Sequence, residues 1–365
     1  MKKAIWLVIL VLLFSGCYSK DPSKESAPSS QDRESNSSSA TTEATSPEEK
    51  NTTVSDEATE EHGESQRPVK KVVILDEAEE LFVIPVNQGE NSLKAMVFTP
   101  MDQLPEGVTI EEQDHYEYGP DAFAVRSDDE AFVVDTYNMR VLRVKKGNDI
   151  EAKAFDNQTV GSLFDVILVH EACVYVVGGK GVGCWNTESG EVTTIAHDFE
   201  KAGDFYPSHL IWQDGLIICN GHSDGMNLRM DEENRTFTET TDGYSFQTIN
   251  DKKFRVSLLG MEWVIPSEKM WMSVVGPGPD GSLFTLANDK EVKDGRWHET
   301  FVQQYGNKES AKNSEEVLSS VRIPMASVWW PPHSMATVGP DGVYAFVVEE
   351  QTASIVKLIS FESVE

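Results

Sequence analysis

The chain has 365 residues, of which 39% are hydrophobic, and a formal net charge of -30 at pH 7. The large excess of acidic residues disfavours nucleic-acid binding, because an acidic surface repels phosphate backbones. It also repels anionic lipid headgroups, so the folded part of the chain is not expected to bind a membrane through its own surface.

The N-terminus has the pattern of an export signal. Lys2 and Lys3 precede an unbroken apolar run from Ala4 to Phe14, and Ser15-Gly16-Cys17 follows. This run is shorter than the roughly 20 residues that a transmembrane helix needs, and small residues follow it where a signal peptidase would cut. Residues 1–17 are therefore expected to be a cleaved signal peptide.

The end of this segment, Leu13-Phe14-Ser15-Gly16-Cys17, resembles the lipobox of bacterial lipoproteins, with Phe14 where that family usually has Leu, Val or Ile. The resemblance implies that Cys17 receives diacylglycerol and becomes the first residue of the mature protein. The alternative is an ordinary secretory signal with an incidental cysteine. Lipid chains contribute about 0.8 kcal/mol for each buried methylene group. We therefore expect a lipid-anchored protein of the cell envelope, on the outer membrane or the outer face of the cytoplasmic membrane.

Residues 18–68 are rich in Ser, Thr and Glu and contain almost no large apolar side chain. Such a segment cannot bury enough surface to offset the entropy lost on ordering. It is expected to be a disordered linker between the lipid and a folded domain at residues 69–365.

From residue 69 onward, short β-rich runs are separated by Asp, Gly, Asn and Pro, which predicts an all-β domain. The expected strands are 72–75, 81–86, 123–125, 132–134, 141–144, 166–169, 174–177, 210–212, 216–218, 254–259, 271–275, 283–286, 343–348 and 354–359. No long apolar pattern of helical period occurs. The charged stretch 308–321 is the exception and is expected to be a helical or mobile insertion.

A strand, an acidic turn and a second strand recur along this domain. The turn residues Asp129, His170 and Asp214 are 41 and 44 residues apart, which is the period of a four-stranded propeller blade, about 40–50 residues. The later spacing is less regular, and an insertion after Lys290 would explain part of the difference. The sequence therefore predicts a β-propeller with six or seven four-stranded blades.

Two segments carry a family resemblance. Residues 119–125 and 131–141, which include Asp135-Thr136-Tyr137-Asn138-Met139-Arg140-Val141, resemble an NHL repeat. Residues 332–344 resemble a blade of the streptogramin lyase group of propellers, except for Ser334 in place of the usual Gly and Ala345 in a strand that the family fills with aromatic residues. Both resemblances imply a propeller.

Four polar residues open the predicted inner strands, namely Asp121, Asp165, His209 and His333. Inner strands line the channel of a propeller, so these side chains are expected to converge at one channel mouth. Two carboxylates (Asp121 and Asp165) and two imidazoles can bind a divalent metal such as Ca or Mg, or serve as acid and base. The resemblance to streptogramin lyases makes His333 a candidate for proton transfer. If the protein is an enzyme, His209 is the other candidate for this role. The alternative is that each side chain caps its own strand.

Aromatic and turn residues suggest further roles. Trp329 and Trp330 adjoin Pro331-Pro332 just before His333, where exposed indoles would stack on sugars or peptide side chains. Trp212 and Trp271 are expected to pack in the core. The turn at 135–138 is expected to bond to its local backbone, with a calcium site as the alternative.

Three cysteines follow Cys17, namely Cys173, Cys184 and Cys219. Outside the cytoplasm, an odd number predicts at least one free thiol or an intermolecular bond. A two-residue hairpin loop at Gly178-Gly179 would place Cys173 directly opposite Cys184. This pair is a candidate disulfide, and two buried thiols are the alternative.

These observations favour an extracytoplasmic propeller that binds a protein, peptide or glycan without catalysis of its own. The alternative is a metal-dependent lyase or lactonase-like enzyme with its site at the channel mouth. A structural subunit of an envelope assembly is a third possibility. Binding modules tolerate degenerate blades, whereas an enzyme needs several matching inner-strand residues, and this difference favours binding.

Overall fold

The computed structural model describes residues 70–94, 122–197, 199, 207–221, 227–250, 253–258, 260–266, 272–288, 292–293, 296–297, 300–306, 317–324, 335–348 and 351–363. The chain divides into two units, Met1–Glu64 and Ser65–Glu365, and every described residue belongs to the second. Within the described residues, no helix has the length and apolar character that crossing a membrane requires.

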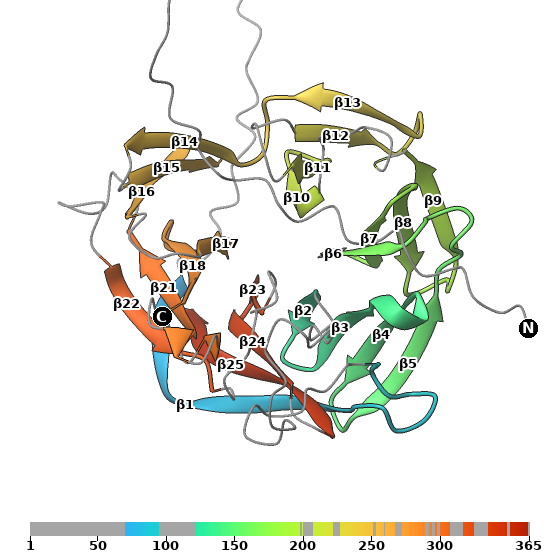
Figure 1. Ribbon diagram of the computed structural model, residues 1–365, viewed down its shortest axis with the longest axis horizontal. Coiled ribbons are helices and arrows are strands. Elements are labelled where there is room, and N and C mark those ends of the chain that lie inside the picture. The colour runs from blue at the N-terminus through green and yellow to red at the C-terminus, as the bar shows by residue number, and fades with distance from the viewer. Residues whose placement is uncertain are drawn as a thin grey trace, which may run out of the picture. The chain divides into compact units, whose positions relative to one another are not determined.

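Six antiparallel sheets surround a common centre as the blades of a β-propeller (Figure 1). Blade I consists of β2 (Phe123–Ser127), β3 (Glu130–Asp135), β4 (Arg140–Lys145) and β5 (Asp149–Ala154). Blade II consists of β6 (Leu163–His170), β7 (Cys173–Gly178), β8 (Gly181–Asn186) and β9 (Val192–Ala196). Blade III consists of β10 (Pro207–Gln213), β11 (Leu216–Gly221), β12 (Asn227–Asp231) and β13 (Thr236–Thr240).

The remaining blades depart from this regular pattern. Blade IV has three described strands, β14 (Ser245–Asn250), β15 (Lys253–Leu258) and β16 (Met261–Pro266). Blade V consists of β17 (Met272–Pro277), β18 (Leu283–Asn288), β21 (Thr300–Tyr305) and β22 (Val317–Arg322), with the hairpin β19 (Val292–Lys293) and β20 (Arg296–Trp297) between β18 and β21. Blade VI consists of β23 (Ala336–Gly339), β24 (Gly342–Val348), β25 (Thr352–Ser363) and β1 (Lys70–Pro85).

The predicted all-β propeller is confirmed, and its blade number is six. The insertion expected after Lys290 is also confirmed, as the hairpin β19–β20. The prediction for 308–321 was wrong in part, because β22 begins at Val317, while 307–316 lies outside the described residues. The two strands expected at 72–75 and 81–86 are one strand, β1, whose register with β25 shifts between Ile74 and Glu79.

The closure of the ring joins the two ends of the domain. Strand β1, from the N-terminal end, is the outer strand of blade VI and pairs with β25, from the C-terminal end. Across the neighbouring interface, Asp128 of blade I accepts hydrogen bonds from the Tyr344 hydroxyl at 2.7 Å and the Lys357 ammonium at 2.7 Å. The last blade is thereby fixed to the first.

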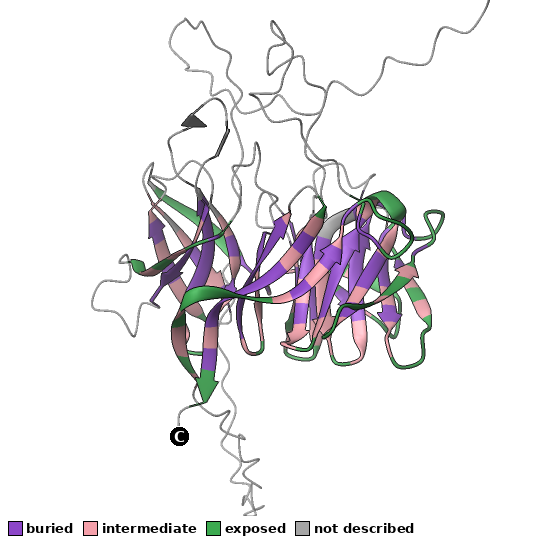
Figure 2. Ribbon diagram, turned by 90° about the horizontal axis from the view of Figure 1, so that it is seen from below, coloured by how far each residue is buried: buried purple, intermediate pink, exposed green. Residues whose placement is uncertain are grey.

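The core lies between the faces of adjacent blades, and buried residues are concentrated in the strands (Figure 2). Side chains alternate between the two faces of a strand, so each blade contributes one row of apolar side chains to each neighbour. Phe132 of blade I and Trp185 of blade II, for example, meet edge to face with centroids 6.0 Å apart.

Five strands gather around the centre of the ring, namely β2, β6, β10, β17 and β23 (Figure 1). Strand β2 contacts β23 and β6, β6 contacts β10, and β17 contacts β23. Strand β14 of blade IV lies near the outside of the ring instead. Residues 241–244 alone connect β13, the outer strand of blade III, to β14. Blade IV is therefore displaced outward relative to the other blades.

Candidate functional site

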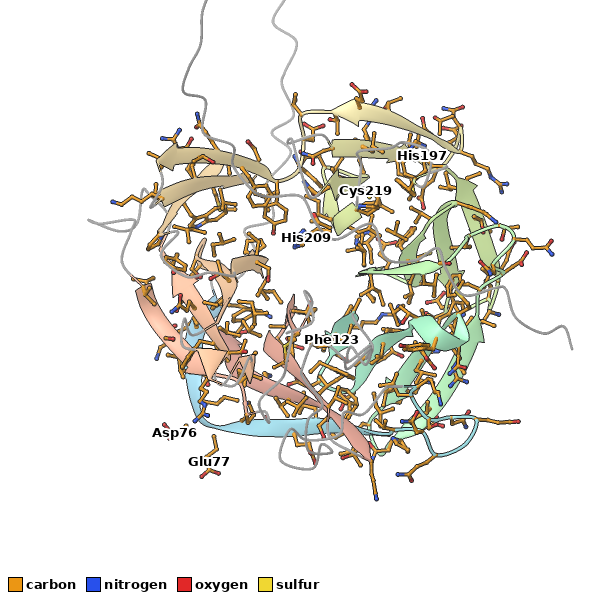
Figure 3. The ribbon with its side chains drawn as sticks, in the orientation of Figure 1. Asp76, Glu77, Phe123, His197, His209 and Cys219 are labelled. Carbon is orange, nitrogen blue, oxygen red and sulfur yellow. The ribbon has the colours of Figure 1, made fainter. Side chains whose placement is uncertain are left out.

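His209 lies in the inner strand β10, and its side chain is at the inner edge of blade III (Figure 3). Its Nδ1 atom is 3.0 Å from the Ser208 hydroxyl, and its Nε2 atom is 2.9 Å from the carbonyl oxygen of Val274 in β17. The ring also lies 5.5 Å, centroid to centroid, from the buried ring of Tyr244.

These contacts make His209 a link between blades III and V. A carbonyl oxygen only accepts, so Nε2 carries the hydrogen and donates it to Val274. The inner strand of blade IV would stand between β10 and β17, and because that blade is displaced outward, His209 bridges the two strands directly. These contacts match the strand-stabilising alternative, while a catalytic role for His209 stays a prediction.

Of the other three predicted channel-mouth residues, only Asp165 lies in a described strand. Asp165 lies in β6, the inner strand next to β10, so the structure brings it and His209 to adjacent strands. Outside the described residues lie Cys17, Asp121, Trp329, Trp330 and His333, and also Trp271, which was expected in the core. No group of three His, Cys, Asp or Glu side chains placed to hold a metal occurs in the described part of the chain.

The predicted pairing of Cys173 directly opposite Cys184 was wrong in register. The hairpin loop is Gly179-Lys180, so Cys184 pairs with Tyr175, and Cys173 pairs with Asn186. The two cysteines are diagonal neighbours, and both thiols are free. Burial, and next a hydrogen bond with Cys173, raises the pKa of the Cys184 thiol to about 12, so this thiol is protonated at neutral pH.

The NHL-like turn forms a compact polar cluster. The buried Asp135 carboxylate accepts 2.8 Å hydrogen bonds from the Asn138 amide and from the Arg140 guanidinium. Residues Thr136–Asn138 form one turn of 3₁₀ helix, η3, and Met139 closes it with a left-handed backbone at φ 52°. The turn expected here is confirmed, but it is stabilised mainly by side-chain contacts.

An exposed aromatic pair, Trp212 and His170, was not predicted from the sequence. Trp212, near the end of β10, was expected in the core, but 38% of its surface is exposed. Its indole stacks on the imidazole of His170, the last residue of β6, with centroids 3.7 Å apart and planes at 15°. The signal that was available is position, because Trp212 lies two residues before the Asp214-Gly215 turn, where β10 leaves the core.

Two acidic turns flank this pair. Glu171 follows His170 and Asp214 follows Gln213, and both have left-handed backbones, at φ 48° and φ 50°. They occupy corresponding positions in the first turns of blades II and III. Because His170 and Trp212 stack at the ends of adjacent strands, the two turns lie on the same face of the propeller. This set, Trp212, His170, Glu171 and Asp214, is called the stacked-indole site below.

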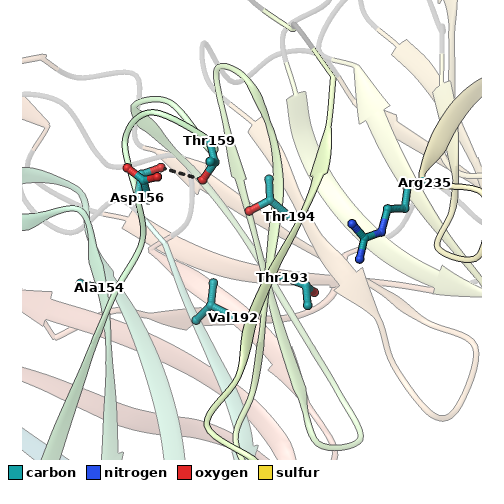
Figure 4. A pocket seen from close by; sticks show the side chains of 7 residues that line it. All are labelled: Ala154, Asp156, Thr159, Val192, Thr193, Thr194 and Arg235. Carbon is teal, nitrogen blue, oxygen red and sulfur yellow. Dashed lines mark hydrogen bonds between the residues drawn. The ribbon is translucent and has the colours of Figure 1, made fainter.

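An open depression of about 460 Å³ lies elsewhere, beside the outer strand β9 (Figure 4). Its lining residues are Ala154, Asp156, Thr159, Val192, Thr193, Thr194 and Arg235. The Asp156 carboxylate accepts a hydrogen bond of 2.9 Å from the backbone N–H of Gln158, within its own turn. The depression is open, and its lining contains no His, Cys or Lys that could act as a base or nucleophile beside Asp156.

No protein-family model and no curated protein sequence matches the chain. A streptogramin B lyase structure is 12% identical with a TM-score of 0.41, over 66% of this chain and 93% of the other. A virginiamycin B lyase from Staphylococcus aureus is 12% identical with a TM-score of 0.38, over 79% and 99%. The calcium-binding protein regucalcin from Agrobacterium tumefaciens is 10% identical with a TM-score of 0.37, over 65% and 88%. These similarities all have TM-scores below 0.5, and the fold assignment rests on the strand order of the chain itself.

Proposed function

We propose that this protein is a lipid-anchored, extracytoplasmic β-propeller that binds a protein, peptide or glycan. In this proposal, diacylglycerol on Cys17 holds the protein in the envelope and the segment 18–68 acts as a tether. The propeller presents the binding surface and carries out no reaction.

The observation that carries the proposal is the exposure of Trp212 on a rigid support. Aromatic side chains that are fixed in place and exposed are frequent anchors of binding surfaces, because they bury a large apolar area at a small entropic cost. Trp212 is held by its stack on His170 and keeps 38% of its surface exposed. The contacts of His209 add support, because this histidine, one of the two candidate catalytic residues, already joins two blades.

Oxidative footprinting tests the binding function without knowledge of the ligand. Hydroxyl radicals are applied to the purified full-length protein and to intact cell envelopes, and oxidation of each side chain is measured by mass spectrometry. Trp212 is expected to be protected in envelopes. Phe246, which has 42% of its surface exposed on blade IV, is the internal control and is expected to react equally in both samples. Equal reactivity of Trp212 in both samples would contradict the proposal.

The anchor and the enzymatic alternative have their own tests. Cys17→Ala is expected to move the protein from the membrane to the soluble fraction, and unchanged membrane association would contradict the lipid anchor. For the enzyme, calcium and magnesium are titrated calorimetrically into wild type, His333→Ala and His209→Gln. Stoichiometric metal binding that either variant abolishes would replace the binding function with the metal-dependent one.

A further inference from the structure

We propose that the stacked-indole site binds a basic side chain, arginine or lysine, of a peptide or protein partner. This inference rests on the proposed binding function and names its ligand class. It combines a preformed aromatic surface with the Glu171 carboxylate beside it and with Asp214, which is exposed in the neighbouring turn.

The aromatic surface is preformed. One face of the Trp212 indole lies against His170 at 3.7 Å, which fixes the ring orientation before any ligand arrives. Because the pair joins the ends of β6 and β10, it is supported by two different blades. A ligand that covers the exposed part of the indole therefore orders few additional rotamers, which lowers the entropic cost of binding.

The carboxylates at its edge are available to a cation. The Glu171 side chain is 84% exposed, and its carboxylate lies 3.8 Å from Nε2 of His170. Asp214 stands at the matching turn position two residues beyond Trp212. Among the described residues, no lysine or arginine forms an ion pair with Glu171 or Asp214. A cationic group of a ligand would therefore compete with no lysine or arginine of the described residues for these two carboxylates.

The sign of the charge selects the ligand class. A guanidinium or ammonium group is attracted to the face of an indole and to neighbouring carboxylates at the same time. The formal charge of -30 raises the local concentration of cations and repels polyanions. A neutral glycan would also stack on an indole, but it gains nothing from this charge. The combination of groups therefore favours a basic peptide.

The test uses two acetylated and amidated peptides, Gly-Arg-Gly-Arg-Gly and the same peptide with citrulline in place of arginine, titrated into the full-length protein in detergent. Citrulline keeps the shape of arginine and removes its charge. The arginine peptide is expected to bind about tenfold more tightly than the citrulline peptide. Trp212→Leu is expected to weaken the arginine peptide about tenfold. The matched control Phe246→Leu, at another exposed aromatic residue, is expected to bind like wild type.

Two further variants distinguish binding at the stacked-indole site from nonspecific attraction to the acidic surface. His170→Phe keeps a ring beneath the indole and is expected to preserve binding, whereas Glu171→Gln combined with Asp214→Asn is expected to weaken it severalfold. Arginine-peptide binding that Trp212→Leu leaves unchanged would overturn the proposal, because the net charge alone would then explain it.

A glycan probe distinguishes failure of this inference from failure of the binding function. If neither peptide binds but chitotetraose binds in a Trp212-dependent manner, the basic-ligand inference is overturned and the binding function stands. If no probe binds and Trp212 is also unprotected in envelopes, both are overturned.

Discussion

Blades I and IV show how differently one fold unit is built within one chain. Blade I has four strands, its second strand β3 is almost entirely buried, and the Asp135 cluster closes its second turn. Blade IV has three described strands, and every described side chain of β14 is exposed. The apolar side chains of blade IV are concentrated instead in β15 and β16, around the fully buried Trp263.

The two blades are held in the ring in different ways, one by a buried polar cluster and the other by a large buried side chain. In blade I, the buried Asp135 carboxylate fixes the turn between β3 and β4. The NHL-like sequence contains the residues that form this cluster. Blade IV lacks this motif and depends on packing against its neighbour, where the Trp263 indole donates a 3.1 Å hydrogen bond to the carbonyl oxygen of Gly281 in blade V. Blade IV is therefore joined to the next blade through one large side chain.

Removal of this side chain gives the largest expected effect. Trp263→Ala deletes a fully buried indole and its hydrogen bond, so it is expected to lower the free energy of unfolding by about 3–5 kcal/mol. Denaturant unfolding of the purified protein measures the change. Trp263→Phe, which restores a ring without the N–H group, is expected to recover part of the loss. A loss below about 1 kcal/mol for Trp263→Ala would show that blade IV contributes little to stability.

The next effect concerns the motif of blade I. Asp135→Ala leaves the Arg140 guanidinium, 16% exposed, without its carboxylate partner, and is expected to cost about 3 kcal/mol. Arg140 still donates to the carbonyl oxygens of Glu90 and Ser92, which limits the loss. The control in the same blade is Asp129→Ala, whose ion pair with Lys146 is exposed on both sides and is expected to leave unfolding unchanged. Equal effects of the two substitutions would contradict the role of burial.

The sequence predicted those elements whose conformation is determined by residues close together in the chain. The propeller class and the first hairpins of blades I, II, III, V and VI were predictable, because acidic turns separate short apolar strands at regular spacing. Outer strands such as β5 and β9 were missed, since they are half-exposed and carry Thr, Glu and Lys beside few apolar residues. The place of β1 was not predictable either, because its partner β25 comes from the other end of the domain.

The candidate site also depends on contacts between distant parts of the chain. His209 was identified as a residue that opens an inner strand, but its hydrogen bond to Val274 depends on the outward displacement of blade IV, which local sequence does not encode. The exposure of Trp212 likewise depends on where β10 ends relative to β6.

A smaller effect tests how the ring closes beside blade IV. His209→Ala removes the hydrogen bonds to Ser208 and Val274 and is expected to lower the free energy of unfolding by about 1–2 kcal/mol. His209→Gln retains a side-chain donor for the Val274 carbonyl and is expected to lose less. Thermal unfolding of the two variants measures the difference. If both variants unfold like wild type, the link between β10 and β17 is not a stabilising contact.

The smallest expected effect concerns the edge of blade IV. Phe246 is 42% exposed on β14, and β14 pairs only with β15 among the described strands. Phe246→Lys is therefore expected to change the free energy of unfolding by no more than about 0.5 kcal/mol. It is also expected to reduce self-association at high concentration, because a charge on an unpaired edge opposes pairing with another chain. Denaturant unfolding and light scattering measure the two effects. A loss above about 1.5 kcal/mol would show that another segment of the chain covers β14, and that blade IV is as complete as blade I.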